Sequence, residues 1–211
     1  EYIRASIEMC VQGFTYQTVF RYLRCTMSDV TRMETDRLEN YVLALGIRGF
    51  ARWDEKWVRI YRGMRPEEIL QINESREKFI EEVRPLAQLL SGKKKTVRTC
   101  CEGLYQFITD SRIYEKLQVQ EAIFRDAGNK AMEKEYGQIY AIVMNLLDKM
   151  VEILGEEMVS PQEFAQILET GLSRAQVALI PPAMDQVLVG DMERTRLKSI
   201  RALFFVGVNE G

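Results

Sequence analysis

The chain has 211 residues, a formal net charge of −2 at pH 7, 46% hydrophobic residues and 28% charged residues, which is typical of a globular domain with one sizeable core. No apolar run approaches the roughly 18 residues that a membrane-spanning helix needs. Histidine is absent, which excludes a Ser-His-Asp triad or a histidine-bearing metal site. Because the overall charge is balanced, any contact with nucleic acid must come from local basic patches.

The remaining reactive side chains do not form a recognisable catalytic or metal-binding pattern. The four cysteines are Cys10, Cys25, Cys100 and Cys101, and none of them belongs to a Cys-x-x-Cys pair. Adjacent Cys100 and Cys101 point to different faces of a helix and cannot readily share a tetrahedral metal. We therefore expect free, mostly buried thiols in a reducing cytosol. The phosphate-binding pattern G-x-x-x-x-G-K-[ST] is also missing.

The first part of the chain predicts short helices. Apolar residues recur at helical spacing in two segments of residues 1–24, which are separated by Val11-Gln12-Gly13. Thr15 is placed to cap the second segment. Residues 25–34 are polar and predict a loop. A helix marked by apolar residues from Leu38 to Leu45 follows, and Gly46 is expected to end it as a C-cap.

A long helix is predicted from Pro66, as the first helical residue, to about Ser91. Pro85 lies inside this helix and is expected to kink or break it near Val83, because proline removes a backbone donor and its ring crowds the preceding turn. Two further helices are predicted at about residues 96–110 and 113–126.

The last predicted helices follow from apolar width and from capping residues. Residues 130–154 carry the widest apolar face in the chain, so we expect them to form the central helix. Ser160-Pro161-Gln162-Glu163 is a capping box with proline at the first helical position. It predicts a helix that ends at Gly171.

The end of the chain has a different character. Residues 187–189 and 203–208 are short runs rich in β-branched and aromatic residues, the kind of run that forms a strand buried in a mostly parallel sheet. No such sheet is visible in the preceding residues. The chain also starts without Met and stops just after an apolar run, so we expect a piece of a larger protein. The predicted fold class is mainly α, a multi-helix bundle of seven or eight helices with a short β-strand tail.

The stretch of residues 46–65 is the first candidate for binding. It has six basic and two acidic residues, a local charge of +4, and it is interleaved with Phe50, Trp53, Trp57 and Tyr61. Such a mixture can line a path for single-stranded nucleic acid, because rings stack on bases while cations neutralise phosphates. The alternative, which we favour, is that the aromatic residues from Trp53 to Tyr61 are core anchors with basic side chains around them. The candidate DNA contacts here are Arg48, Arg52, Lys56 and Arg59.

The second candidate is the tightest basic cluster of the chain. It consists of Lys93, Lys94, Lys95 and Arg98 and lies between two predicted helices. Lysines at this place complement the C-terminal dipole of the preceding helix, which requires no ligand. A solvated loop is therefore the favoured interpretation, and a phosphate contact is the alternative.

Several stretches resemble the AddB (RexB) family of bacterial AddAB-type helicase–nucleases. They are Y-Q-T-V-F-R-Y-L-R at 16–24, L-E-N-Y-V-L-A-L-G-I-R-G at 38–49 with Trp53 and Trp57, I-P-P-A-M-D-Q-V-L-V-G at 180–190, R-T-R at 194–196, and F-F-V-G-V-N-E-G at 204–211. The tail gives the most specific match. Residues from about 65 to 160 match mainly in their helical pattern.

The resemblance implies a domain organisation like that of superfamily 1 helicases. Residues 1–30 would flank the insert as part of the second RecA-like domain, residues 31–175 would form the helical insert domain called 2B, and residues 176–211 would return into the RecA-like domain near motif V. Residues 186–197 depart from the H-x-x-K-G-x-E core of active helicases. This departure argues against nucleotide coupling there and leaves contact with DNA open.

The resemblance also implies a function. The parent complex would be an ATP-dependent helicase and exonuclease of the bacterial cytoplasm that processes DNA double-strand breaks for recombination. DNA and an AddA-type protein would be its partners, without a membrane or a small-molecule substrate. This segment would catalyse nothing and hold no cofactor, since ATP and Mg would bind the AddA-type partner, and the nuclease metal and iron–sulfur cluster would lie outside it. Arg194, Arg196 and Lys198 would be further DNA contacts, and a purely architectural helical module is the alternative.

Overall fold

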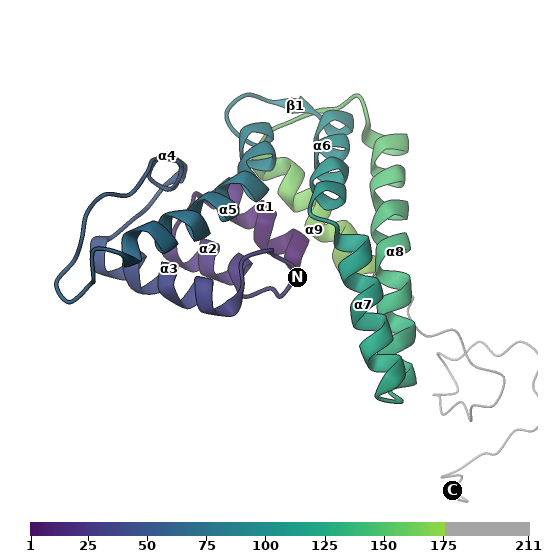
Figure 1. The fold of residues 1–211 in the computed structure, drawn as a ribbon. Coiled ribbons are helices and arrows are strands. Elements are labelled where there is room, and N and C mark those ends of the chain that lie inside the picture. The colour runs from purple at the N-terminus through teal and green to yellow at the C-terminus, as the bar shows by residue number, and fades with distance from the viewer. Residues whose placement is uncertain (176–211) are drawn as a thin grey trace, which may run out of the picture. The chain divides into compact units, whose positions relative to one another are not determined.

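The computed structural model describes residues 1–175, which are coloured in Figure 1. Within them there are nine helices and one two-stranded sheet, which confirms the mainly α fold class. The elements are α1 (Tyr2–Gln12), α2 (Tyr16–Leu23), α3 (Arg32–Leu45), α4 (Phe50–Asp54), α5 (Glu68–Leu89), β1 (Lys95–Thr96), α6 (Val97–Asp110), α7 (Ile113–Asp126), α8 (Lys130–Leu154), β2 (Met158–Val159) and α9 (Pro161–Ala175). The predicted strands at 187–189 and 203–208 lie outside the described residues.

Side-chain caps fix several helix starts. Thr15 caps α2 as predicted, with its hydroxyl accepting from the backbone N–H of Thr18. Helix α3 begins at Arg32, inside the stretch predicted as a loop. The reason is a second capping box, in which the N–H of Glu34 donates to Thr31 Oγ1 at 3.3 Å and the N–H of Thr31 donates to Glu34 Oε2 at 2.6 Å.

The capping box that opens α9 is confirmed, but the predicted end of this helix is wrong. The N–H of Ser160 donates to Glu163 Oε2 at 2.7 Å, as expected for a capping box. The helix then continues through Gly171 to Ala175. A Cβ atom at Gly171 would lie 2.6 Å from Cδ1 of Leu146 on α8. This glycine therefore permits a close approach of α8 and α9 instead of ending the helix.

Helix α5 runs without a break through Pro85, from Glu68 to Leu89. The prediction that proline breaks the helix near Val83 is therefore wrong, and the helix begins at Glu68 instead of at Pro66. Pro85 is exposed, while Val83 and Leu86 beside it are almost completely buried. Burial of the apolar face compensates for the hydrogen bond that proline removes on the solvent side.

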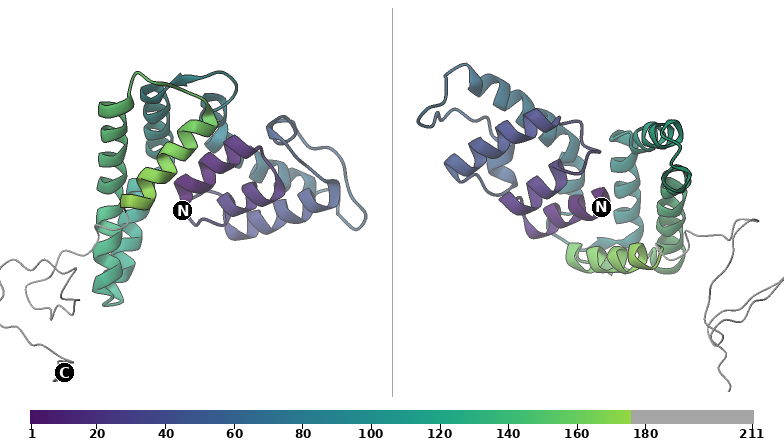
Figure 2. Two further views of the ribbon diagram at one scale, coloured as in Figure 1. Left: turned by 180° about the vertical axis from the view of Figure 1, so that it is seen from behind. Right: turned by 90° about the horizontal axis from the view of Figure 1, so that it is seen from below.

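The core is built around α5, which buries nine of its residues. The ring of Phe79 lies 5.0 Å from Trp53, 5.9 Å from Tyr22 and 6.2 Å from Phe14, centroid to centroid. In Figures 1 and 2, α1 to α4 gather along α5, while α7 and α8 run side by side as a helical pair. Within residues 1–175, no helix is both long and apolar enough to cross a membrane.

Helix α8 is not the central helix that its apolar width predicts. Only Leu147 and Met150, near its C-terminal end, are fully buried. Apolar residues elsewhere in the helix, such as Tyr136 and Val143, are only partly covered. The helix packs mainly on its neighbour α7 and reaches α6 and α9 over the rest of its length, so one wide apolar face is shared among three partners.

A short sheet joins the start of α6 to the connection between α8 and α9. Strands β1 and β2 pair antiparallel, with Lys95 opposite Val159 and Thr96 opposite Met158. The N–H of Val97 also donates to the carbonyl of Glu157 at 2.9 Å. This pairing fixes the backbone of the lysine cluster, and two-residue strands carry no periodicity from which to predict them.

Candidate nucleic-acid interface

The two tryptophans of residues 46–65 belong to the core. Trp53 is 0% exposed and Trp57 is 4% exposed, with their ring centroids 5.1 Å apart. The favoured interpretation as core anchors is confirmed, and base stacking on either ring is wrong because both are covered. Their helical spacing is not the cause, since α4 ends at Asp54 and Trp57 lies beyond it.

The side chain of Asn73 on α5 holds the backbone of Trp57. The N–H of Trp57 donates to Asn73 Oδ1 at 2.9 Å, and Asn73 Nδ2 donates to the carbonyl of Trp57 at 2.8 Å. The indole Nε1 of Trp57 donates to the carbonyl of Arg52 at 2.7 Å. One buried amide thus replaces both backbone partners that a neighbouring strand would supply.

Arg76, one turn further along α5, supports the end of α4. This residue is only 5% exposed. Its Nη1 donates to the carbonyl of Trp53 at 2.8 Å and to that of Asp54 at 3.3 Å. A cation at these carbonyls complements the C-terminal helix dipole. Sequence analysis missed Asn73 and Arg76, although two polar residues spaced i, i+3 on the apolar stripe of α5 were a usable signal.

The predicted basic residues of this stretch lie on the surface. Arg48, Arg52, Lys56 and Arg59 are all exposed. Arg52 forms an ion pair with Glu55, at 2.8 Å. As far as residues 1–175 are described, the other three form no ion pair. The buried aromatic anchors therefore present a row of free cations to solvent.

The lysine cluster is more occupied with intramolecular partners. Lys94 pairs with Glu163 at 3.5 Å, and Arg98 pairs with Glu156 at 2.8 Å. Lys95 Nζ donates to the carbonyl of Ser91 at 3.4 Å, just beyond the C-terminal end of α5. The interpretation as a helix-end complement fits this contact. Within the described part of the chain, exposed Lys93 forms no such contact.

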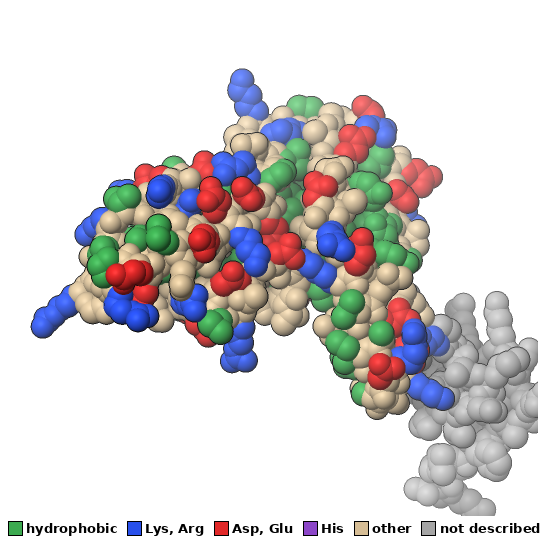
Figure 3. Space-filling view, in the orientation of Figure 1, with side chains coloured by type: hydrophobic (Ala, Val, Ile, Leu, Met, Phe, Trp, Pro, Cys, Tyr) green, Lys and Arg blue, Asp and Glu red, His purple; other side chains and the backbone are tan. Residues whose placement is uncertain are grey.

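The two cationic segments lie toward opposite ends of α5. Arg65 pairs with Glu68 at the start of this helix, while Lys95 contacts Ser91 just past its end. A helix of 22 residues is about 33 Å long. Figure 3 shows basic and acidic side chains interspersed over the face that it draws, without a single basic field. A ligand that touches both segments must therefore span roughly ten base pairs of duplex, at about 3.4 Å each. Arg194, Arg196 and Lys198 lie outside the described residues.

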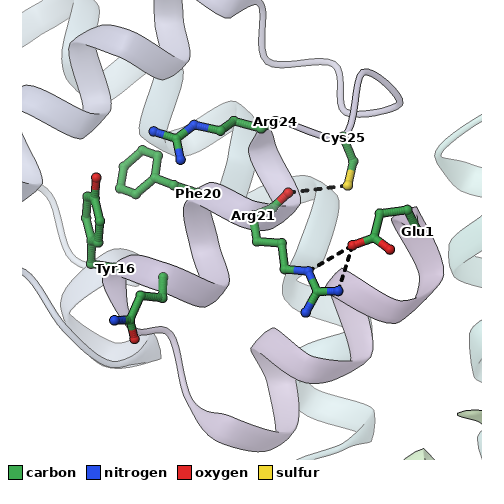
Figure 4. Close-up of a pocket in the computed structure, with 7 residues that line it drawn as sticks. Glu1, Tyr16, Phe20, Arg21, Arg24 and Cys25 are labelled. Atoms are coloured by element: carbon green, nitrogen blue, oxygen red, sulfur yellow. Dashed lines mark hydrogen bonds and ion pairs between the residues drawn. The ribbon is translucent and has the colours of Figure 1, made fainter.

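A surface pocket of about 460 Å³ beside α2 offers no reactive group (Figure 4). Its Arg21 pairs with Glu1 at 2.7 Å, and its Arg24 pairs with Glu39 at 2.6 Å. The thiol of Cys25 donates to the carbonyl of Arg21 at 3.3 Å, and burial raises its pKa. The cations of this pocket are already paired, and its thiol stays protonated at neutral pH.

The other thiols are equally unreactive in their surroundings. Cys100 and Cys101 are buried, and Cys10 is partly covered. Burial raises the pKa of Cys10 to about 12 and that of Cys101 to about 12. Among residues 1–175 no group of three or more His, Cys, Asp or Glu side chains is arranged to hold a metal ion.

The fold and surface define a mainly α-helical module in which buried aromatic and polar anchors present two separate cationic segments. No protein-family model matches the chain. Over 99–100% of its length it is similar to proteins named as the AddB component of an ATP-dependent helicase/deoxyribonuclease. The identity is 44% with the protein of Lachnoclostridium phytofermentans, 40% with that of Clostridium novyi and 38% with that of Clostridium botulinum strain Hall.

The chain belongs to this AddB family, as the sequence resemblance predicts. It spans only 18–19% of the length of these relatives. The similarity therefore concerns one segment of a much larger polypeptide.

Proposed function

We propose that this chain positions DNA within a helicase–deoxyribonuclease and catalyses nothing itself. The observation that carries the proposal is the set of exposed cations at Arg48, Lys56 and Arg59, which form no ion pair among residues 1–175. They stand on a backbone that Asn73 and the buried tryptophans hold in place. Cations presented on a rigid support bind phosphates at a lower entropic cost than flexible ones.

The names of the relatives support DNA as the ligand, since they describe part of a helicase and deoxyribonuclease. The same proposal includes processing of double-strand breaks by the parent complex and an AddA-type protein as its partner. It also includes the assignment of residues 1–30 and 176–211 to a RecA-like domain around a helical insert. ATP, the nuclease metal and the iron–sulfur cluster would be held elsewhere in that complex.

The experiment is a salt titration of DNA binding by the 211-residue chain, on duplex, forked and single-stranded DNA, read by fluorescence anisotropy. On duplex DNA, log K falls with log salt by about 0.9 per phosphate contact. Replacing Lys56→Gln and Arg59→Gln should make the slope shallower by about 1.8. The matched control is Lys130→Gln with Lys134→Gln, which removes the same charge from exposed positions on α8.

Two results would contradict the proposal. One is the absence of binding at low salt to any of the three DNAs. The other is an equal loss of slope in the α8 control, because the contact would then be diffuse. Either result favours the architectural alternative.

One observation favours a second, protein-binding function. Val119 and Ile123 on α7 are 58% and 51% exposed. They lie one turn apart on the same face of this helix. Apolar side chains in such a row suit a contact with another protein surface. Co-purification of the chain with the remainder of its parent polypeptide, weakened by Val119→Ser with Ile123→Ser, would test this role.

A further inference from the structure

Two large aliphatic side chains stand in solvent within the cationic stretch. Val58 is 75% exposed and Ile60 is 49% exposed. Lys56 and Arg59, on either side of Val58, are also exposed. Exposed apolar side chains cost free energy in water, about 25 cal/mol for each Å² that could be buried. Their place between free cations indicates an anionic partner with an apolar interior.

The backbone beneath these side chains is held by one tyrosine of α3. The ring of Tyr41 stacks on Trp57, with centroids 4.7 Å apart and planes at 9°. The same ring meets Tyr61 edge-on at 6.2 Å. Its hydroxyl donates to the carbonyl of Arg59 at 2.8 Å. Residues 57, 59 and 61 are thus tied to the core by ring or backbone.

This alternation directs the intervening side chains outward. Residues 56–60 have no helical or strand pairing, and in extended backbone successive side chains point to opposite sides. With Trp57 inward at 4% exposure, Val58 and Ile60 project together to solvent. The result is a short, rigid apolar ridge with a cation on each flank, whereas scattered exposed aliphatic residues need no partner.

We propose that Val58 and Ile60 form a wedge that inserts between neighbouring base pairs of duplex DNA, with Lys56 and Arg59 on the adjacent phosphates. This inference rests on the proposed DNA-positioning function and names the contact that it makes. Proteins use aliphatic side chains in this way to unstack a base step and bend the duplex. Such side chains carry no hydrogen-bonding group, so the wedge selects deformable pyrimidine–purine steps and not particular bases.

The test uses the 211-residue chain and a duplex with 2-aminopurine placed at a TA step, because the emission of this base rises when it unstacks. The wild-type chain should raise the emission on binding. Val58→Ser with Ile60→Ser should abolish the rise and leave the salt slope of binding unchanged, since no cation is lost. The matched control is Val119→Ser with Ile123→Ser on α7, which removes the same two side-chain types and should keep the rise.

A second variant tests the support of the wedge. Tyr41→Phe removes the hydroxyl that holds the Arg59 carbonyl and keeps the aromatic ring. The emission rise should become smaller at unchanged salt slope, because the ridge is less firmly placed. Thermal melts of all variants establish that they are folded.

The outcomes separate this inference from the function on which it rests. Wild-type binding without a rise in emission, or a rise that survives in the Val58→Ser, Ile60→Ser chain, overturns the wedge and leaves DNA positioning intact. Absence of wild-type binding to DNA overturns both. Binding to vesicles of phosphatidylserine and phosphatidylcholine that these two substitutions abolish, with no emission change on duplex, assigns the ridge to a lipid surface and overturns the wedge.

Discussion

Replacing Asn73 by alanine should destabilise the fold by about 3 kcal/mol, because two buried backbone groups lose their partner. The Asn73 side chain accepts from the N–H of Trp57 at 2.9 Å and donates to its carbonyl at 2.8 Å. Each unsatisfied buried group costs about 1–3 kcal/mol. Asn73 is 7% exposed, so water can reach the site only after the chain around Trp57 has moved.

The matched control is Asn145→Ala on α8. Asn145 is exposed and also lies inside a helix. Both substitutions gain the higher helix propensity of alanine, a few tenths of a kcal/mol, and only Asn73→Ala loses buried hydrogen bonds. The difference between the two variants therefore measures the hold on Trp57.

The assay is urea unfolding followed by tryptophan fluorescence. The chain has two tryptophans, Trp53 on α4 and Trp57 beside Asn73, and both are buried. A shift of native emission to longer wavelength in Asn73→Ala would show that the segment loosens before global unfolding. An unfolding free energy within about 0.5 kcal/mol of the control would refute the reasoning, because surface substitutions alone change stability by that amount.

Two further predictions concern helix ends and pH. Hydrogen bonding from the backbone N–H of the α9 N-cap lowers the pKa of Glu163, and a hydrogen bond from Arg4 lowers that of Glu169. The stability that these two glutamates add is present above their unfolded pKa near 4.5 and is lost as pH falls through the lower folded values, so amide exchange in α9 should quicken below pH 4.5 while Glu169→Gln shows a smaller change. Thr31→Ala removes the capping box of α3 and should lower the unfolding free energy by about 1 kcal/mol, read by urea melts; no change would show that water caps the helix equally well.

Local rules predicted the elements whose cause is local. Thr15 caps α2 and Ser160 caps α9 because a hydroxyl three residues before a free backbone N–H reaches it without help from the rest of the chain. Gly46 ends α3 with a φ of 63°, which glycine adopts at little cost. The same rules erred at Pro85 and Gly171, where packing on neighbouring helices outweighs the local preference.

The candidate interface was predicted only in part. The basic residues were visible in the sequence, and their exposure agrees with the choice of Arg48, Lys56 and Arg59. The covering of both tryptophans was favoured, but its cause was not visible. Asn73 and Arg76 supply it from a helix that follows the stretch by many residues, and no local spacing connects them to Trp57.

By itself, the sequence determined the mainly α fold class, most helix starts, the family and the positions of its cations. The tertiary structure decided which cations are already paired, because ion pairs such as Lys94 with Glu163 join residues far apart in the chain. It also decided that α5, and not the more apolar α8, carries the core. The physical reason is that burial depends on how many neighbours cover a face, whereas periodicity records only how wide that face is.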